Sequence, residues 1–302
     1  MDKPADKLEP VRAGVGDVFT LALGAVLMFI NTLLFIYVVW NRNYPPLRAK
    51  NIKLIAILYL SMLIWYFGTI GTNFNLYSYF NLKSTCILFG LWFRILLGVF
   101  MFIHVHVFRL YIYIRIFIQL RRVDYRQYVI AVFLYVAMIC SVGVPLSILR
   151  SKLTVRYITQ LETCIYGTAF TEISFVIVWA GWATTLVFTF LARKINSSFK
   201  EHREMMLIVF LSSIAITYMT VVHHIVRAYT LHQWSRVTTT YAEYIASQSS
   251  LFILLSVPAY NCMFHHDEYR RKFFDKMRSD GMASRYSMTL PSADMGSQPQ
   301  TV

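Results

Sequence analysis

The stretch GLWFRILLGVF, residues 90–100, holds ten uncharged residues and one arginine, Arg94, near its middle. It lies in an apolar run over about 87–115, which exceeds the roughly 20 residues that a helix needs to cross a bilayer core. An arginine at the centre of such a helix costs at least about 2.5 kcal/mol if it faces lipid. We therefore expect Arg94 to point into a helix bundle rather than at hydrocarbon.

The composition of the whole chain agrees with a membrane protein. Hydrophobic residues make up 57% of the 302 residues and charged residues only 15%, against roughly 25% charged residues in soluble domains. A net charge of +14 would suggest a nucleic-acid ligand in a soluble protein. Here the basic residues fall in short segments between apolar runs, so the expected partners are anionic inner-leaflet lipids, and no nucleic acid is expected.

Apolar runs long enough to span a membrane predict seven helices. They lie near residues 18–40, 52–71, 87–115, 128–149, 170–192, 205–226 and 241–263. The predicted fold is thus an all-α membrane protein built as a seven-transmembrane helix bundle. Its expected parts are an extracellular N-terminal tail (1–17), the bundle (18–263), a short amphipathic helix on the membrane surface (264–280) and a disordered cytoplasmic tail (281–302).

The amphipathic helix is predicted from the sequence HHDEYRRKFFDKMRSD, residues 265–280. Tyr269, Phe273, Phe274 and Met277 recur at the spacing of one helical face, and basic residues occupy the other. A helix of this pattern lies in the plane of the membrane surface.

Lysine and arginine residues predict the orientation. Of the 29 in the chain, 19 lie in the segments that end or follow the first, third, fifth and seventh runs, nine lie in the opposite set, and Arg94 is the remaining one. Short cytoplasmic loops carry the excess of basic residues. We therefore expect a plasma-membrane protein with its N-terminus outside and its C-terminus in the cytoplasm.

Two of the four cysteines fall on the predicted outer side. Cys86 begins the third span, and Cys164 lies in the loop between the fourth and fifth spans. Disulfides persist in that oxidising environment. We expect a Cys86–Cys164 bridge, with two unrelated thiols as the alternative.

Seven spans, an external N-terminus and this bridge together resemble a G-protein-coupled receptor. The chain lacks three motifs of animal members: acid-Arg-Tyr, Trp-x-Pro and Asn-Pro-x-x-Tyr. It resembles more closely the fungal receptor-like proteins that often carry a C-terminal regulator-of-G-protein-signalling domain. Three stretches carry that resemblance: YPPLRAKN (44–51), CILFGLWFRILLGVF (86–100) and FRLYIYIRIF (108–117).

The resemblance implies a signal transducer that senses an extracellular ligand in the bundle and couples to a heterotrimeric G protein. About 24 residues follow position 278, which are too few for the signalling domain. We expect either a short member of that family or a truncated chain.

Arg94 is the first candidate on the ligand side. It follows Cys86 by eight residues, or about 12 Å of helix at 1.5 Å per residue. Two acids, Glu172 and Glu243, are expected at a similar depth. Arg94 could form a structural ion pair with one of them or bind an anionic or carbonyl group of a ligand. The candidate ligand-binding residues are Arg94, Trp92, Glu172, Glu243 and Tyr241.

Arg109 leads the candidates on the signalling side. The resemblance places it where receptors carry their activation-linked arginine, with Tyr111 beside it, but Phe108 replaces the usual acid. The alternative is an interfacial arginine that binds lipid phosphates. The candidate G-protein-coupling residues are Arg109, Tyr111, Arg115, Arg121 and Arg122.

Other classes of seven-helix protein are less well supported. The pairs His104/His106 and His223/His224 lack the i, i+3 or i+4 spacing of helical metal ligands, so we expect no metal site and no enzyme. Interior histidines should instead form hydrogen bonds across helices. The last run, 241–263, has no lysine for a retinal Schiff base, and no cofactor is expected. A small-solute transporter and a non-signalling scaffold or trafficking protein stay open.

Overall fold

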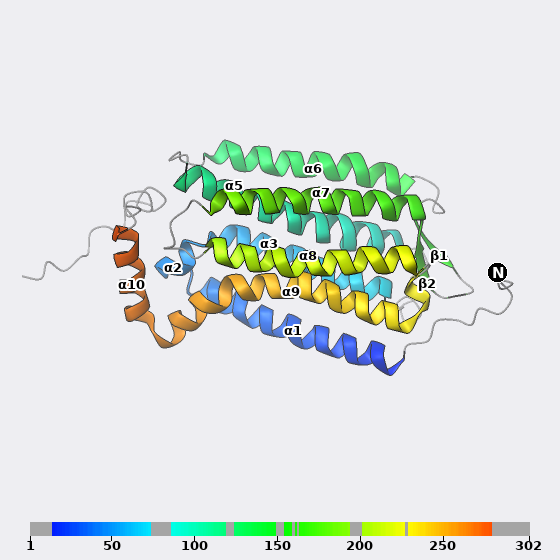
Figure 1. Cartoon of the computed structure of the whole chain (residues 1–302), viewed down its shortest axis with the longest axis horizontal. Helices are drawn as coiled ribbons and strands as arrows, with labels where there is room; N and C mark the ends of the chain where they lie inside the picture. The colour runs from blue at the N-terminus through cyan, green and yellow to red at the C-terminus, as the bar shows by residue number, and fades with distance from the viewer. Residues whose placement is uncertain are drawn as a thin grey trace, which may run out of the picture.

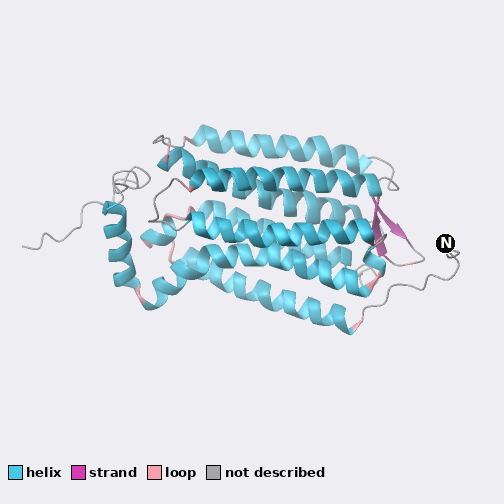
Figure 2. Ribbon diagram, viewed as in Figure 1, coloured by secondary structure: helices cyan, strands magenta, loops and turns pink. Residues whose placement is uncertain are grey.

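The computed structural model describes residues 14–73, 86–118, 124–148, 154–158, 161, 163–193, 201–226 and 229–279. Almost all of these residues are helical (Figure 2). The long helices are α1 (Val15–Trp40), α3 (Ile52–Asn73), η2 (Ile87–Phe100) with its direct continuation α5 (Met101–Phe117), α6 (Tyr125–Ile148), α7 (Thr168–Ala192), α8 (Glu201–Ile225) and α9 (Gln233–Phe264).

These helices lie side by side along the long axis of the molecule (Figure 1). One end of the bundle carries an antiparallel hairpin of β1 (Val155–Ile158) and β2 (Thr163–Tyr166), and we refer to it as the hairpin end. The other end carries the short helices α2 (Pro45–Arg48) and α10 (His266–Ser279), and we refer to it as the α10 end. α1 begins at the hairpin end, so the chain enters the bundle at one end and leaves it at the other.

Six of the described helices are long and apolar enough to cross a membrane: α1, α3, the continuous η2–α5 helix, α6, α7 and α8. The protein is therefore an all-α membrane protein, as the composition predicts. The seventh long helix, α9, is not among the six because it is rich in polar residues. Most of these are buried, as Arg236, Glu243 and Gln248 illustrate, so its polar side chains face the bundle.

α9 also begins earlier than the sequence predicts. The expected seventh run starts at 241, whereas the helix starts at Gln233. The extra turns hold Ser235, Arg236 and Thr239, which are typical of a loop by composition but are all buried here. Of the predicted terminal tails, 1–13 and 281–302 lie outside the described residues, and α1 already begins at Val15.

Small residues allow two of the central helices to come close together. A Cβ atom at Gly68 of α3 would lie 2.5 Å from the backbone nitrogen of Arg94, and one at Gly98 would lie 2.8 Å from Cβ of Trp65. Glycine at such contacts lets helix backbones approach in a membrane. The backbone of Arg94 therefore lies directly against α3.

The helix that carries Arg94 is wound differently from the regular α-helix assumed for the sequence. Residues Ile87–Phe100 form a π-helix, which continues without a break into α5. Hydrogen bonds from residue i to i+5 widen the turn, and π segments are frequent at functional sites.

A helix, α10, is present where the sequence predicts the amphipathic one, and it lies across the end of the bundle (Figure 1). Phe273 is buried, whereas the basic residues Arg270, Arg271 and Lys272 are exposed. The hydroxyl of Tyr44 donates a hydrogen bond of 3.0 Å to the carbonyl of His266, which ties the start of α10 to the α2 turn.

Candidate functional site

Arg94 points into the bundle, as predicted, and only 6% of its surface is exposed. Its Nε donates to Oε1 of Glu243 at 3.1 Å, and its Nη2 forms an ion pair with the same carboxylate oxygen. Of the two candidate acids, Glu243 of α9 is thus the partner. The buried charge is neutralised within the protein, which removes most of the cost of placing an arginine there.

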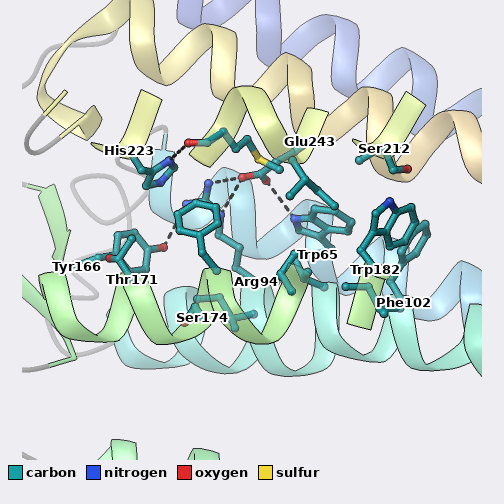
Figure 3. Close-up of a pocket in the computed structure, with 18 of the residues that line it drawn as sticks. Trp65, Arg94, Phe102, Tyr166, Thr171, Ser174, Trp182, Ser212, His223 and Glu243 are labelled. Atoms are coloured by element: carbon teal, nitrogen blue, oxygen red, sulfur yellow. Dashed lines mark hydrogen bonds and ion pairs between the residues drawn. The ribbon is translucent and has the colours of Figure 1, made fainter. Parts of the chain in front are cut away.

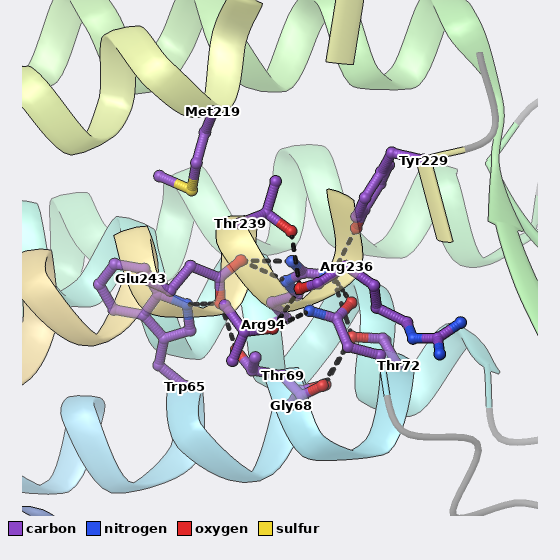
Figure 4. Close-up of polar contacts among 12 residues, drawn as sticks. Trp65, Gly68, Thr69, Thr72, Arg94, Met219, Tyr229, Arg236, Thr239 and Glu243 are labelled. Carbon is purple, nitrogen blue, oxygen red and sulfur yellow. Dashed lines mark hydrogen bonds and ion pairs between the residues drawn. The ribbon is translucent and has the colours of Figure 1, made fainter. Parts of the chain in front are cut away.

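The other oxygen of the Glu243 carboxylate is also occupied. Oε2 accepts hydrogen bonds from Nε1 of Trp65 at 3.1 Å and from the hydroxyl of Thr69, both on α3 (Figure 4). Glu243 itself is only 4% exposed. A buried carboxylate with four donors around it has little capacity left for another partner.

Arg94 extends the same network toward the hairpin end. Its Nη1 donates to the hydroxyl of Thr72 at 3.0 Å and to Oδ1 of Asn73 at 3.1 Å. The same nitrogen lies 3.1 Å from the hydroxyl of Tyr166 on β2 and 2.9 Å from that of Tyr229 in η4 (Tyr229–Leu231). Burial raises the pKa of the Tyr229 phenol, so this residue stays neutral beside the arginine.

The predicted disulfide holds the hairpin above this network. Cys86 and Cys164 are bonded, with their Cα atoms 5.8 Å apart. The bridge links the start of η2 to β2, the strand that also supplies Tyr166. We refer to Arg94, Glu243, Trp65, Thr69, Thr72, Asn73, Tyr166 and Tyr229 as the Arg94 network.

A cavity of about 110 Å³ lies beside the Arg94 network (Figure 3). Its walls come from α3, η2, α5, α7, α8 and α9, with β2 and η4 at the hairpin end, so most of the bundle contributes to it. The lining is mainly apolar and aromatic, with Phe102, Phe170 and Trp182 among its residues. Mostly apolar pockets with a few polar groups are typical of small-molecule sites.

Several polar side chains of the cavity wall lie outside the Arg94 network, namely Thr171, Ser174, Ser212 and His223. Ser212 of α8 is 1% exposed, and within the described chain its hydroxyl has no hydrogen-bond partner. His223 of the same helix has its Nδ1 2.7 Å from the carbonyl of Met219. Because a carbonyl only accepts, Nδ1 carries the proton, and Nε2 of the neutral ring is an acceptor.

Three of the predicted ligand-side residues are not brought together with Arg94. Glu172 is exposed and lies 3.1 Å from Nε2 of the equally exposed His224. Trp92 faces α6, where its Nε1 donates to the hydroxyl of Ser147 at 3.0 Å. Tyr241 packs against the main hydrophobic core and does not line the cavity. Of the predicted set, only Arg94 and Glu243 meet.

The predicted coupling residues lie toward the α10 end where they are described. Arg109 of α5 is buried, with 3% exposure. Tyr111 stacks on Phe108, and the guanidinium of Arg115 lies over the Tyr111 ring, 5.9 Å from its centre. Arg121 and Arg122 lie outside the described residues.

The expectation that interior histidines form hydrogen bonds across helices holds for His104, which bonds to the backbone of Ala131 on α6, and fails for His106. His106 is fully buried, yet neither ring nitrogen has a hydrogen-bond partner among the described residues. The ring instead packs edge-on against Phe102, with centroids 4.6 Å apart. Nor does the described part of the chain contain a group of three or more His, Cys, Asp or Glu side chains that could hold a metal ion.

Sequence reasoning missed a second buried ion pair. Arg236 at the start of α9 donates to both carboxylate oxygens of Asp17 in α1, at 3.0 and 2.6 Å. Both side chains are nearly inaccessible. In the sequence each lies near the edge of an apolar run, where a solvated loop charge is the ordinary expectation. This pair fastens α1 to α9 at the hairpin end.

No family model matches the chain, and no curated protein matches it either.

Proposed function

We propose that this chain is a receptor-like signal transducer of the G-protein-coupled type, resembling the fungal receptor-like family. In this proposal the six apolar helices and α9 all span the plasma membrane. The hairpin end faces outward and the α10 end faces the cytoplasm. The excess of basic residues toward the α10 end supports this orientation, as does a disulfide at the hairpin end, where an oxidising environment would preserve it.

The buried polar face of α9 supports its role as the seventh span. Asn31 of α1 donates to Oε1 of Gln248 at 2.8 Å, and Arg236 and Glu243 pair with acid and base on other helices. Polar side chains in membrane helices generally face the bundle interior and pair there. A helix of this kind can span a bilayer although its mean hydropathy is modest.

The cavity beside the Arg94 network is the observation that carries the proposal. It lies inside the bundle, and residues from α3, η2, α5, α7, α8 and α9 line it. A ligand there would contact nearly every central helix at once. Its binding energy could therefore favour one arrangement of the helices over another, which is the thermodynamic requirement for signalling.

At the α10 end, the proposed partner is a heterotrimeric G protein. Arg109 is buried in the described conformation, so an opening of this end would be needed to expose it. Lys50, which follows α2, forms an ion pair with Glu204 near the start of α8. We infer that this pair holds α8 in the closed arrangement, while α10 and the basic loops bind anionic inner-leaflet lipids.

The test is nucleotide exchange on a panel of Gα subunits, measured without ligand in membranes that carry the chain. The expected result is a basal exchange signal that Arg109→Ala removes. Arg126→Ala serves as the matched control because Arg126 is exposed at the same end of the bundle. If folded, surface-expressed protein activates no Gα, the proposal fails. Solute flux would then distinguish a transporter from a non-signalling scaffold.

A further inference from the structure

The cavity favours a different kind of ligand from the one that the charge of Arg94 suggests. An arginine near the mouth of a bundle favours an anionic or strongly polar ligand. In the structure, both Arg94 and Glu243 are buried, and the carboxylate of Glu243 accepts hydrogen bonds from Nε and Nη2 of the arginine. The remaining nitrogen, Nη1, has four oxygen atoms within 3.1 Å.

An anionic ligand would have to compete with this arrangement. To bind Arg94 it must displace Glu243, which would leave a carboxylate buried beside Trp65 and Thr69 without its cation. Uncompensated buried charges are strongly destabilising. A ligand that brings its own negative charge would therefore put two acids in one apolar site. The saturated pair acts as a neutral wall of the cavity.

The size of the cavity limits the ligand as well. Its volume of about 110 Å³ is somewhat smaller than that of an engineered apolar cavity of about 150 Å³ that binds benzene or xenon. A single ring or a short branched chain fits this space. The aromatic side chains of Phe102, Phe170 and Trp182 offer it a hydrocarbon surface.

Two of the polar groups in the cavity wall indicate what else the ligand can carry. The Ser212 hydroxyl is buried and has no partner within the described chain, which is a cost that a ligand could relieve. Nε2 of His223 is an acceptor on the same helix. Either group suits a hydroxyl, and neither carries a charge in this arrangement. Because eleven residues of α8, or about 16 Å of helix, separate them, a single hydroxyl bonds to one of the two and not to both.

We propose that the cavity binds a small, uncharged, largely hydrocarbon molecule with at most one hydroxyl group, and that it excludes anions. This inference rests on the proposed function for placing the ligand inside the bundle. It concerns binding alone, however, and can be tested without any G protein.

The experiment uses the purified full chain in detergent and measures the thermal unfolding temperature with three probes. Benzene and cyclohexanol are uncharged, and cyclohexanecarboxylate is an anion with a ring of similar size. The cavity is blocked by Ser174→Trp, since Ser174 lines it. Val176→Trp is the control, because Val176 is on the same helix and 68% exposed. If Ser174→Trp does not fold, Val99→Phe adds a smaller volume to the cavity, because Val99 also lines it.

We expect benzene and cyclohexanol to raise the unfolding temperature by about 5 °C at a concentration a hundred times their dissociation constant. The rise should persist in Val176→Trp and vanish in the blocked variant, and cyclohexanecarboxylate should give none. Ser212→Ala should weaken the binding of cyclohexanol about fivefold and leave the binding of benzene unchanged.

The inference is overturned if the anion stabilises the chain and the neutral probes do not, or if blocking the cavity changes nothing. These results are separable from the signalling test. Binding with no nucleotide exchange would contradict only the proposed function, whereas exchange without binding of the neutral probes would contradict only this inference.

Discussion

The Arg94–Glu243 pair gives the sharpest prediction about stability. Glu243→Gln keeps the size of the side chain but removes its charge, so Arg94 remains buried with no counter-ion. The glutamine amide also turns a donor toward groups that are themselves donors, either the arginine or Trp65 and Thr69. Removing one member of a buried pair costs about 3–5 kcal/mol. We expect the free energy of unfolding to fall by about 4 kcal/mol, which corresponds to a fall of about 10 °C in the unfolding temperature.

The second half of the prediction concerns the double variant. Arg94→Gln alone should cost a similar amount, since it leaves Glu243 buried and charged. Two glutamines are neutral and can form a hydrogen bond to each other. The loss of unfolding free energy in the double variant should therefore be smaller than the sum of the two single losses, by about 2 kcal/mol or more. Glu172→Gln is the matched control, because Glu172 belongs to an exposed pair with His224 and should leave the unfolding temperature unchanged.

The free cysteines provide the assay. Cys262 is buried and Cys140 is exposed. In a Cys140→Ser background, a thiol-reactive fluorophore reports unfolding through Cys262 during a temperature ramp. The reasoning is refuted if Glu243→Gln behaves like Glu172→Gln, or if the effects of the two single variants simply add.

Three other changes should also destabilise the protein, and the same ramp measures each. Cys86→Ser combined with Cys164→Ser removes the disulfide without leaving a new thiol for the dye. It opens a loop with a sequence separation of 78 residues, which should cost about 4 kcal/mol of unfolding free energy on chain entropy. In a ramp followed by circular dichroism instead of the dye, reductant should reproduce the loss in the native chain and not in the variant. Asp17→Asn leaves Arg236 buried without its acid and should cost about 3 kcal/mol, whereas Glu268→Gln, in the exposed pair with Lys272, should change nothing. Gly68→Ala would place a Cβ atom 2.5 Å from the Arg94 backbone and should cost about 1–3 kcal/mol, and equal stability of this variant would contradict the close packing of α3 and η2.

Hydropathy predicts the long helices well because a lipid-facing helix must be apolar over most of its length. The same rule explains where it fails. The first turns of α9 are polar and face other helices, and composition alone cannot separate such turns from a loop. The buried positions of Arg236 and Asp17 follow from the packing of α9 against α1, which becomes visible only when both helices are placed together.

The candidate site was predictable in part. A charge in the middle of an apolar run is informative by itself, so Arg94 stood out, and two acids at similar depth were its possible partners. The choice of Glu243 depends on which way α7 and α9 are rotated, and Glu172 proves to lie on an exposed face. Trp65 and Thr69 gave no signal, since tryptophan and threonine are ordinary members of a membrane helix.

The central claim is that the contents of the cavity alter the α10 end of the bundle. Spin labels at Arg126→Cys and Arg203→Cys, both exposed positions near that end on α6 and α8, report their separation by pulsed electron spin resonance in a Cys140→Ser background. The account predicts that filling the cavity with Ser174→Trp shifts the distance distribution, while the lipid-facing control Val176→Trp leaves it as it is. An identical distribution in both variants, with the cavity shown to be filled, would contradict a transducer that connects the two ends.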